Sequence, residues 1–232
     1  MDTFDLYKDI QCRTNGEIYL GVVGPVRSGK STFIKRFMDV LVLPKMTDEH
    51  AKERTVDELP QSASGKSIMT TEPKFVPKEA AEIQLAKDVS VLVRLIDCVG
   101  YMVEGAAGHM ENGAERLVKT PWNEKEIPFT KAAEIGTKKV IHDHSTIGIV
   151  VTTDGSIGEL PRNSYRAAEK KTIQELKSIG KPFVVLVNTR KPYSAEAKNV
   201  AEEIQKEYQV TVDRPVTEAF LEGMAAGVPI LD

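Results

Sequence analysis

The 232-residue sequence has few cysteines, no basic excess and no long apolar run. Its two cysteines, Cys12 and Cys98, lie far apart, which is typical of a protein that folds in a reducing cytoplasm. The net charge of -3 does not indicate the basic face of a nucleic-acid-binding protein, so we expect no nucleic-acid partner. No apolar run approaches the ~20 residues of a membrane span, and the acidic start lacks a signal-peptide core. We therefore expect only peripheral membrane contact, made through a partner.

Apolar periodicity along the chain alternates between strand-like and helix-like runs, with no internal repeat. Strands are expected at 18–23, 90–98, 146–152 and 183–187, with a short candidate at 83–85. Helices are expected at 30–43, 47–59, 131–143, 164–179 and 195–208. The segments 62–77 and 99–129 carry turn formers and are expected to be mostly irregular. This order predicts an α/β fold with a mostly parallel sheet and helices on both faces.

A phosphate-binding signature follows the first expected strand. The sequence GPVRSGKS matches G-x-x-x-x-G-K-[ST], and it opens an expected helix, which is the context that the motif requires. Backbone N–H groups of such a loop surround phosphate oxygens, the lysine reaches the β- and γ-phosphates, and the serine ligates Mg²⁺. We expect nucleotide contacts from Gly24, Pro25, Val26, Arg27, Ser28, Gly29, Lys30, Ser31 and Thr32.

Two further segments complete the expected site. Asp97 and Gly100 form a D-x-x-G turn at the end of an apolar strand, so Asp97 can hold Mg²⁺ and the Gly100 backbone can contact the γ-phosphate. Between the two motifs, Thr70 and Thr71 are both candidates for the residue that senses the γ-phosphate through Mg²⁺. The expected metal ligands are therefore Ser31, Asp97 and one or both of these threonines.

The residue after D-x-x-G departs from the usual pattern. Many nucleotide hydrolases carry a glutamine there to orient the attacking water, and this sequence has Tyr101. Arg27, inside the phosphate loop, could supply positive charge in cis as an internal arginine finger, or it could simply face solvent or bind a carboxylate. The sequence therefore leaves open which group positions the water, and it favours slow hydrolysis.

The base-reading element is altered as well. GTPases place N-K-x-D after a strand, and here the chain reads Asn188-Thr189-Arg190-Lys191. Asn188 is retained as a nucleotide contact, whereas Lys191 replaces the aspartate. A lysine cannot accept hydrogen bonds from the guanine ring N–H and amino group, so most of the discrimination for guanine is lost. The sequence favours ATP.

These residues resemble one family specifically. The segments "IYLGVVGPVRSGKSTFIKRF", "DELPQSASGKSIMTTEPKFVP", "VRLIDCVGY", "TPWNEKEIPFTKAAEIGTKKVI" and "HSTIGIVVTTDGSIGELPR" are similar to the N-terminal ATPase domain of the stage IV sporulation protein A family. The resemblance covers about residues 1–208. It implies a P-loop NTPase of the GTPase-like (TRAFAC) type that hydrolyses ATP with Mg²⁺. Lys30, Asp97, Thr70 and Thr71 fall on the family's nucleotide, metal and sensor positions.

The same resemblance implies a biological role. Hydrolysis in the family drives self-assembly into filaments that form the basement layer of the spore coat. Members lie in the mother-cell cytoplasm at the forespore surface, recruited by a small amphipathic membrane-bound peptide, and they bind other coat morphogenetic proteins. We expect residues 1–212 to form the ATPase domain and 213–232 to be a divergent or truncated segment. The alternative functions are a switch GTPase acting on a partner complex and a P-loop kinase, and the D-x-x-G turn disfavours the kinase.

Overall fold

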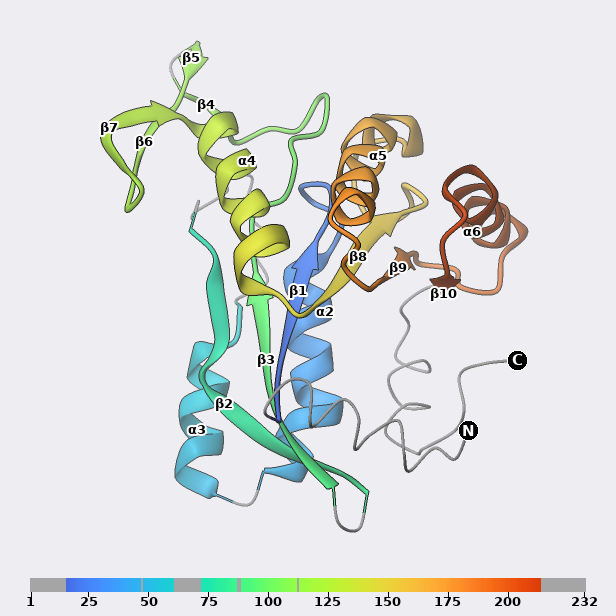
Figure 1. Cartoon of the computed structure of the whole chain (residues 1–232). Helices are drawn as coiled ribbons and strands as arrows, with labels where there is room; N and C mark the ends of the chain where they lie inside the picture. Colours follow the sequence, from blue (N-terminus) through green and yellow to red (C-terminus); the bar gives the residue numbers. More distant parts are fainter. Residues whose placement is uncertain (1–15, 47, 61–71, 87–88, 112, 214–232) are drawn as a thin grey trace.

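A six-stranded sheet forms the centre of the computed structural model, which describes residues 16–46, 48–60, 72–86, 89–111 and 113–213 (Figure 1). The strand order is β10-β9-β8-β1-β3-β2. The strands are β1 (Glu17–Val23), β2 (Lys74–Ala86), β3 (Val89–Asp97), β8 (Ile147–Thr153), β9 (Phe183–Asn188) and β10 (Val212–Asp213). All neighbours are parallel except β2, which runs antiparallel to β3 along one edge. The predicted α/β class and mostly parallel sheet are confirmed.

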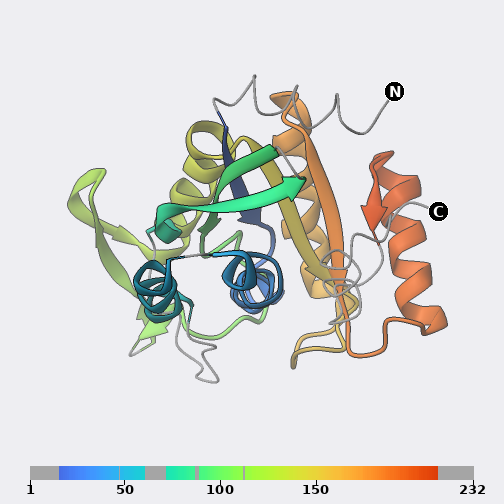
Figure 2. The same cartoon turned by 90° about the horizontal axis from the view of Figure 1, so that it is seen from below.

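Helices cover both faces of this sheet, as predicted. Figure 2 shows α2 (Lys30–Phe37) and α3 (Glu49–Glu58) on one face, with α4 (Phe129–Lys139) and α5 (Arg162–Ser178) on the other. Helix α6 (Ala195–Tyr208) lies beside β10 at the edge opposite β2. Each face has its own apolar core: Phe33 and Ile34 of α2 belong to one cluster, and Phe129 of α4 and Ile173 of α5 belong to the other. The parallel strands are buried from both sides, which explains their near-continuous apolar sequences.

Two predicted helices end in altered turns. Helix α2 is followed by a π-helical turn, Met38–Val42, and a 3-10 turn, Leu43–Lys45. The helix and the two turns together cover the predicted helix at 30–43. Helix α4 is likewise followed by a π-helical turn, Val140–His144. The helical periodicity was therefore correctly located, although the hydrogen-bonding pattern widens to a π-helical turn after each helix and then tightens to a 3-10 turn at Leu43–Lys45.

The edge strand β2 is a correction to the sequence analysis. The prediction assigned 62–77 to a loop and a strand only to 83–85, but β2 begins at Lys74. Pro77 lies where the pairing with β3 shifts between Val76 and Ala81. An edge strand tolerates proline at such an irregularity because the missing N–H need not serve a ladder bond. Residues 61–71 lie outside the described structure.

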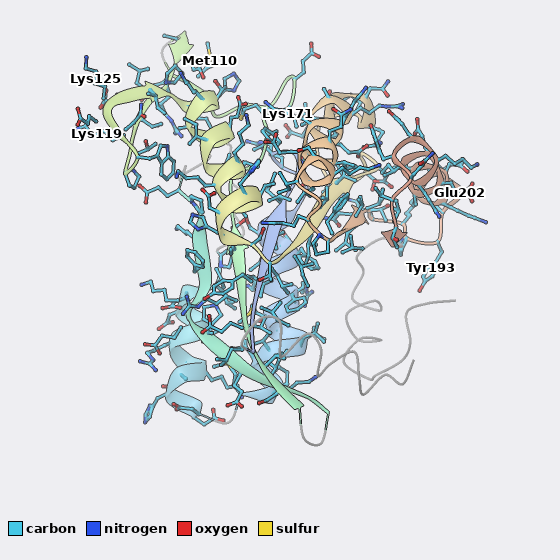
Figure 3. All side chains as sticks on the ribbon, viewed as in Figure 1. Met110, Lys119, Lys125, Lys171, Tyr193 and Glu202 are labelled. Carbon is cyan, nitrogen blue, oxygen red and sulfur yellow. The ribbon has the colours of Figure 1, made fainter. Side chains whose placement is uncertain are left out.

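The segment predicted to be irregular, 99–129, contains two small hairpins, which is a second correction. They pair β4 (Met110–Glu111) with β5 (Ala114–Glu115), and β6 (Leu117–Thr120) with β7 (Asn123–Pro128). Figure 3 shows Met110, Lys119 and Lys125 on these hairpins, away from the central sheet. Most of their residues are exposed, so they lack the alternating apolar signal by which a strand is predicted.

The last described strand, β10, was not predicted. It is two residues long and pairs in parallel with β9 at Val185 and Leu186. Residues 214–232 lie outside the described structure, so the division at residue 212 stays a prediction. No helix among the described residues is long and apolar enough to cross a membrane.

Candidate nucleotide-binding site

The phosphate loop joins the carboxyl end of β1 to α2, at the edge of the sheet where ligands of α/β proteins bind. Gly29 is the residue before α2 and has a left-handed backbone, with φ of 94°. A Cβ at Gly29 would lie 2.1 Å from the side-chain nitrogen of Asn188, so only glycine fits this turn. The N-terminus of α2 therefore lies at the carboxyl end of β1, and its N–H groups are available to a phosphate there.

Lys30 lies at the centre of the loop. Its ammonium donates a hydrogen bond of 2.6 Å to the carbonyl oxygen of Pro25, and its side chain is buried. Burial lowers the pKa of Lys30 from its ordinary value, with the neighbouring Asp97 opposing the shift. A buried cation that holds a single hydrogen bond to a loop carbonyl is well placed to bind an anion.

The two predicted metal ligands meet although they are far apart in sequence. The Ser31 hydroxyl donates a hydrogen bond of 2.9 Å to one carboxylate oxygen of Asp97. The other oxygen, Oδ1, is buried and has no hydrogen-bond partner among the described residues. Burial raises the pKa of Asp97, and the Ser31 hydrogen bond and Lys30 lower it in part. An orphaned carboxylate oxygen beside a hydroxyl fits Mg²⁺, which prefers oxygen ligands.

The turn after β3 touches the phosphate loop directly. A Cβ on Gly100 would lie 2.1 Å from the Gly24 carbonyl oxygen and 2.6 Å from the Lys30 ammonium. Tyr101 and the loop form a parallel bridge, in which the Tyr101 N–H donates to the Gly24 carbonyl at 3.1 Å and the Val26 N–H donates to the Tyr101 carbonyl at 2.8 Å. The D-x-x-G turn therefore lies against the phosphate loop, and the contact of Gly100 with a γ-phosphate stays a prediction.

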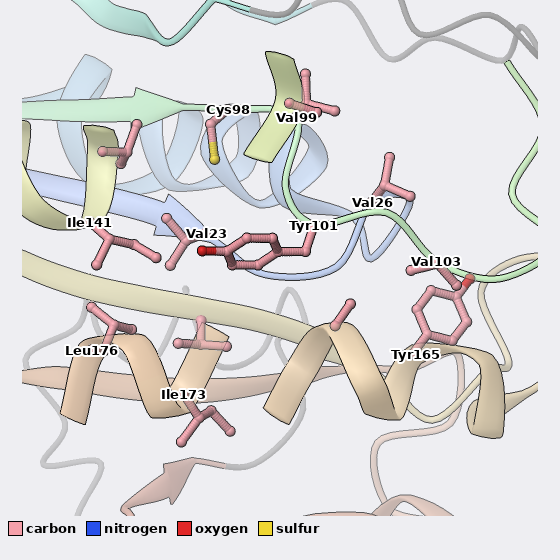
Figure 4. Close-up of a cluster of buried hydrophobic side chains, with 14 of the residues drawn as sticks. Val23, Val26, Cys98, Val99, Tyr101, Val103, Ile141, Tyr165, Ile173 and Leu176 are labelled. Carbon is pink, nitrogen blue, oxygen red and sulfur yellow. The ribbon is translucent and has the colours of Figure 1, made fainter. Parts of the chain in front are cut away.

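The Tyr101 side chain points away from this loop. Figure 4 shows its ring among core residues such as Val23 and Ile173. Its hydroxyl donates to Glu175 of α5 at 3.2 Å, and the Lys171 ammonium lies 4.5 Å from the ring centroid. Burial, and after it the Glu175 carboxylate, raise the pKa of Tyr101. The phenol therefore cannot orient a water at the phosphates in this arrangement.

The remaining predicted residues have different surroundings. Arg27 has a left-handed backbone with φ of 61°, and its guanidinium donates to the Ala107 carbonyl at 3.3 Å. The Ser28 hydroxyl is buried without a partner among the described residues, which suits a phosphate oxygen. Thr32 lies exposed in the first turn of α2. The two sensor candidates, Thr70 and Thr71, lie outside the described residues, so their role stays a prediction.

The altered base-reading element also lies beside the phosphate loop. Asn188 ends β9, and its side-chain amide donates to the Ser28 carbonyl at 3.1 Å. The next residue, Thr189, was not predicted as part of the site. Its hydroxyl donates a hydrogen bond to Asp154, which directly follows β8. The available signal was the run of polar residues, Thr153-Asp154-Gly155-Ser156, directly after a buried strand.

Comparisons with known proteins agree with this geometry. A family model described as "Stage IV sporulation protein A, ATPase domain" matches residues 1–221. "Stage IV sporulation protein A" of Clostridioides difficile (strain 630) is 57% identical over 208 residues, which cover 90% of this chain and 42% of the relative. The protein of that name from Bacillus subtilis (strain 168) is 52% identical over 212 residues, covering 91% and 43%. The chain thus spans less than half the length of these relatives.

Among solved structures, a crystal structure of an SsGBP mutation variant, G235S, matches with a TM-score of 0.47 and 12% identity. The match covers 98% of this chain and 59% of that chain. A likeness at this level carries no argument about function.

Proposed function

The chain belongs to the family of stage IV sporulation protein A, within its ATPase domain, and from this premise we propose that it binds ATP with Mg²⁺ and hydrolyses it. The observation that carries the proposal is the convergence of Lys30, Ser31 and Asp97 beside the phosphate loop. This set supplies a buried cation for phosphate oxygens and two oxygen ligands for a hard divalent ion.

We assign the fold to the P-loop NTPases of GTPase-like (TRAFAC) type. The assignment is supported by the strand–loop–helix setting of GPVRSGKS and by β3, which ends on Asp97 and leads into the D-x-x-G turn. The antiparallel edge strand β2 beside β3 supports it further. The preference for ATP rests on Lys191, which replaces the acceptor that guanine needs.

Each residue has a distinct part in the proposed reaction. Lys30 binds the β- and γ-phosphates, and the N–H groups of the loop surround the remaining oxygens. Ser31 and Asp97 would hold Mg²⁺, which neutralises charge that develops on the transferred phosphoryl group when the ion is bound. Thr70 and Thr71 are the proposed sensors of the γ-phosphate. Arg27 would add a second cation as an internal finger once it leaves the Ala107 carbonyl.

The biological part of the proposal extends beyond this domain. ATP hydrolysis would drive self-assembly into the basement layer of the spore coat, at the forespore surface in the mother-cell cytoplasm. The proposed partners are further copies of the chain, a small amphipathic membrane-bound recruiting peptide and other coat morphogenetic proteins. These roles rest on the resemblance to the family, whose members are more than twice as long as the matched region.

Paired measurements on one sample test the proposal. Turnover of ATP and of GTP is compared for the wild type and Lys30→Ala, and the same mixtures are sedimented. ATP turnover that depends on Lys30 and exceeds GTP turnover supports the ATPase. Preference for GTP would favour the alternative, a switch GTPase acting on a partner complex. ATP turnover without pelleting would contradict self-assembly by this chain while leaving the ATPase standing.

A further inference from the structure

A hydrogen-bonded network joins the carboxyl ends of β8 and β9. The carboxylate oxygen Oδ1 of Asp154 accepts from the backbone N–H of Ser156 at 2.9 Å and from its hydroxyl at 2.6 Å. The other oxygen accepts from the hydroxyl of Thr189. One carboxylate thus ties together two loops that lie thirty-five residues apart in sequence. We call Asp154, Ser156 and Thr189 the carboxylate clamp.

The two hydroxyls of the clamp also fix the backbone of the base-reading loop. The Ser156 oxygen accepts from the Arg190 N–H at 2.9 Å, and the Thr189 oxygen accepts from the Lys191 N–H at 3.1 Å. Each hydroxyl has a single proton, which it donates to Asp154, and lone pairs with which it accepts. The side chains of the clamp therefore hold the backbone of the loop 189–191, in addition to the backbone hydrogen bond that the Ser194 N–H donates to the Lys191 carbonyl.

The end of β8 that carries Asp154 is itself held firmly. The Arg162 guanidinium binds both carboxylate oxygens of the buried Glu169, at 2.6 and 2.8 Å, and donates to the Thr153 carbonyl at 3.3 Å. A Cβ at Gly155, whose φ is 89°, would lie 2.7 Å from the backbone nitrogen of Arg162. The clamp is thus built on a closely packed junction between β8 and α5.

The strand order places the clamp beside the phosphate loop, on the side of the base-reading element. The phosphate loop follows β1, and β8 and β9 are the next two strands toward the base-reading element. Neighbouring strands lie about 4.8 Å apart, so a nucleotide whose phosphates occupy the loop extends across the ends of both. The Asn188 amide bonded to the Ser28 carbonyl at 3.1 Å joins the clamped loop to the phosphate loop.

We propose that the carboxylate clamp is a positioning device for nucleotide recognition: it holds the loop 189–191 in its binding conformation before the base and ribose arrive. The inference rests on the proposed binding of ATP at the phosphate loop. A loop that is already ordered loses less conformational freedom on binding, so the clamp raises affinity for the whole nucleotide. Within the described residues the clamp makes no hydrogen bond to Lys30 or Asp97, so loss of the clamp is expected to weaken binding through the base and ribose and not through the phosphates.

Calorimetric titration of the full chain with ADP and with inorganic tripolyphosphate tests this proposal. Tripolyphosphate has no base or ribose, so it reports the phosphate loop alone. Thr189→Val and Ser156→Ala are each expected to weaken ADP binding about tenfold and to leave tripolyphosphate binding unchanged. Thr189→Ser keeps the hydroxyl and is expected to retain wild-type affinity. Thr172→Val is the matched control, because its buried hydroxyl donates to the Ala168 carbonyl within α5 and not to the clamp.

Three outcomes would overturn the proposal or its premise, and they are distinguishable. Equal weakening of both ligands in Thr189→Val would show that the clamp only supports the overall fold around the phosphate loop. Unchanged ADP affinity in both Thr189→Val and Ser156→Ala would show that the loop needs no clamp. A wild-type protein that binds neither ADP nor tripolyphosphate would contradict the nucleotide site itself, before any variant is compared.

Discussion

The Tyr101 hydroxyl donates a hydrogen bond of 3.2 Å to Glu175, and the side chain that follows D-x-x-G is thereby turned into the core under α5. The backbone of the same residue is bonded to the phosphate loop at Gly24 and Val26. The ring cannot swing toward the phosphates without losing its hydrogen bond to Glu175 and its contacts in the core. A water-orienting role, which glutamine has at this position in many GTPases, must therefore belong to another group.

Tyr101→Phe is accordingly expected to leave ATP turnover unchanged and to lower stability by about 1 kcal/mol, the usual loss for one buried hydrogen bond. The ring keeps its apolar contacts, and Glu175 keeps its hydrogen bond of 2.8 Å with His142. Urea unfolding and steady-state turnover on the same preparations provide the measurement. A tenfold or greater slowing of turnover at unchanged nucleotide affinity would show that the Tyr101 hydroxyl takes part in catalysis.

Arg27 offers a test that separates strain from catalysis. Its left-handed backbone costs on the order of 1 kcal/mol for a residue other than glycine, and such strain persists where function requires it. Arg27→Gly should therefore relieve strain, while loss of a finger should slow turnover by about 10³-fold with nucleotide affinity retained. Arg27→Lys keeps the charge without the planar fork and should be nearly as slow. Wild-type turnover in Arg27→Gly would show that the side chain has no part in catalysis.

Asp97 should make the nucleotide-free protein less stable at neutral pH. Burial raises the pKa of Asp97 in the folded state, so the folded protein favours the protonated carboxyl. The contribution of this group to the free energy of unfolding is therefore fully present below the unfolded-state pKa of about 3.9. That stability is lost as pH rises through the higher folded-state pKa. Asp97→Asn cannot ionise, so its Tm in chelator should exceed the wild-type value by a few degrees near pH 7, and the difference should shrink toward acid pH.

Magnesium provides the second readout for the same variant. Mg²⁺ with nucleotide should raise the Tm of the wild type and have little effect on Asp97→Asn, because the amide is a poor ligand for this ion. An Asn variant that is less stable than the wild type at neutral pH, in chelator, would show that the partners of the carboxylate, among them Ser31, Lys30 and the Cys98 backbone, outweigh its burial.

Most residues of the candidate site could be predicted from sequence because they belong to short contiguous motifs. Lys30 and Ser31 occupy fixed places in the phosphate loop, and Asp97 ends an apolar run that could only be a buried strand. The clamp could not be predicted, because Thr189 meets Asp154 only when β8 and β9 pair in their observed register. The start of β2 was missed for a similar reason, since its partner strand and not its own composition makes it extended.

Base preference gives the last prediction, at Lys191. Two hydrogen bonds from guanine to a carboxylate account for most recognition by N-K-x-D, and charge-assisted bonds contribute about 1.5–3 kcal/mol each. Lys191→Asp should therefore raise the ratio of GTP to ATP in kcat/KM by at least about tenfold. The Lys191 backbone is held by Thr189 through a hydrogen bond of 3.1 Å, so the new carboxylate starts from a fixed position.

Lys191→Ala separates the two parts of this effect. It removes the cation without adding an acceptor, so it should weaken discrimination against GTP only slightly, whereas Lys191→Asp should favour GTP actively. Combining Lys191→Asp with Thr189→Val should reduce the gain, because the carboxylate would then project from a loop that has lost its anchor. If the alanine and aspartate variants accept GTP equally well, lysine excludes guanine by repulsion alone, and the missing acceptor is not what sets the preference for ATP.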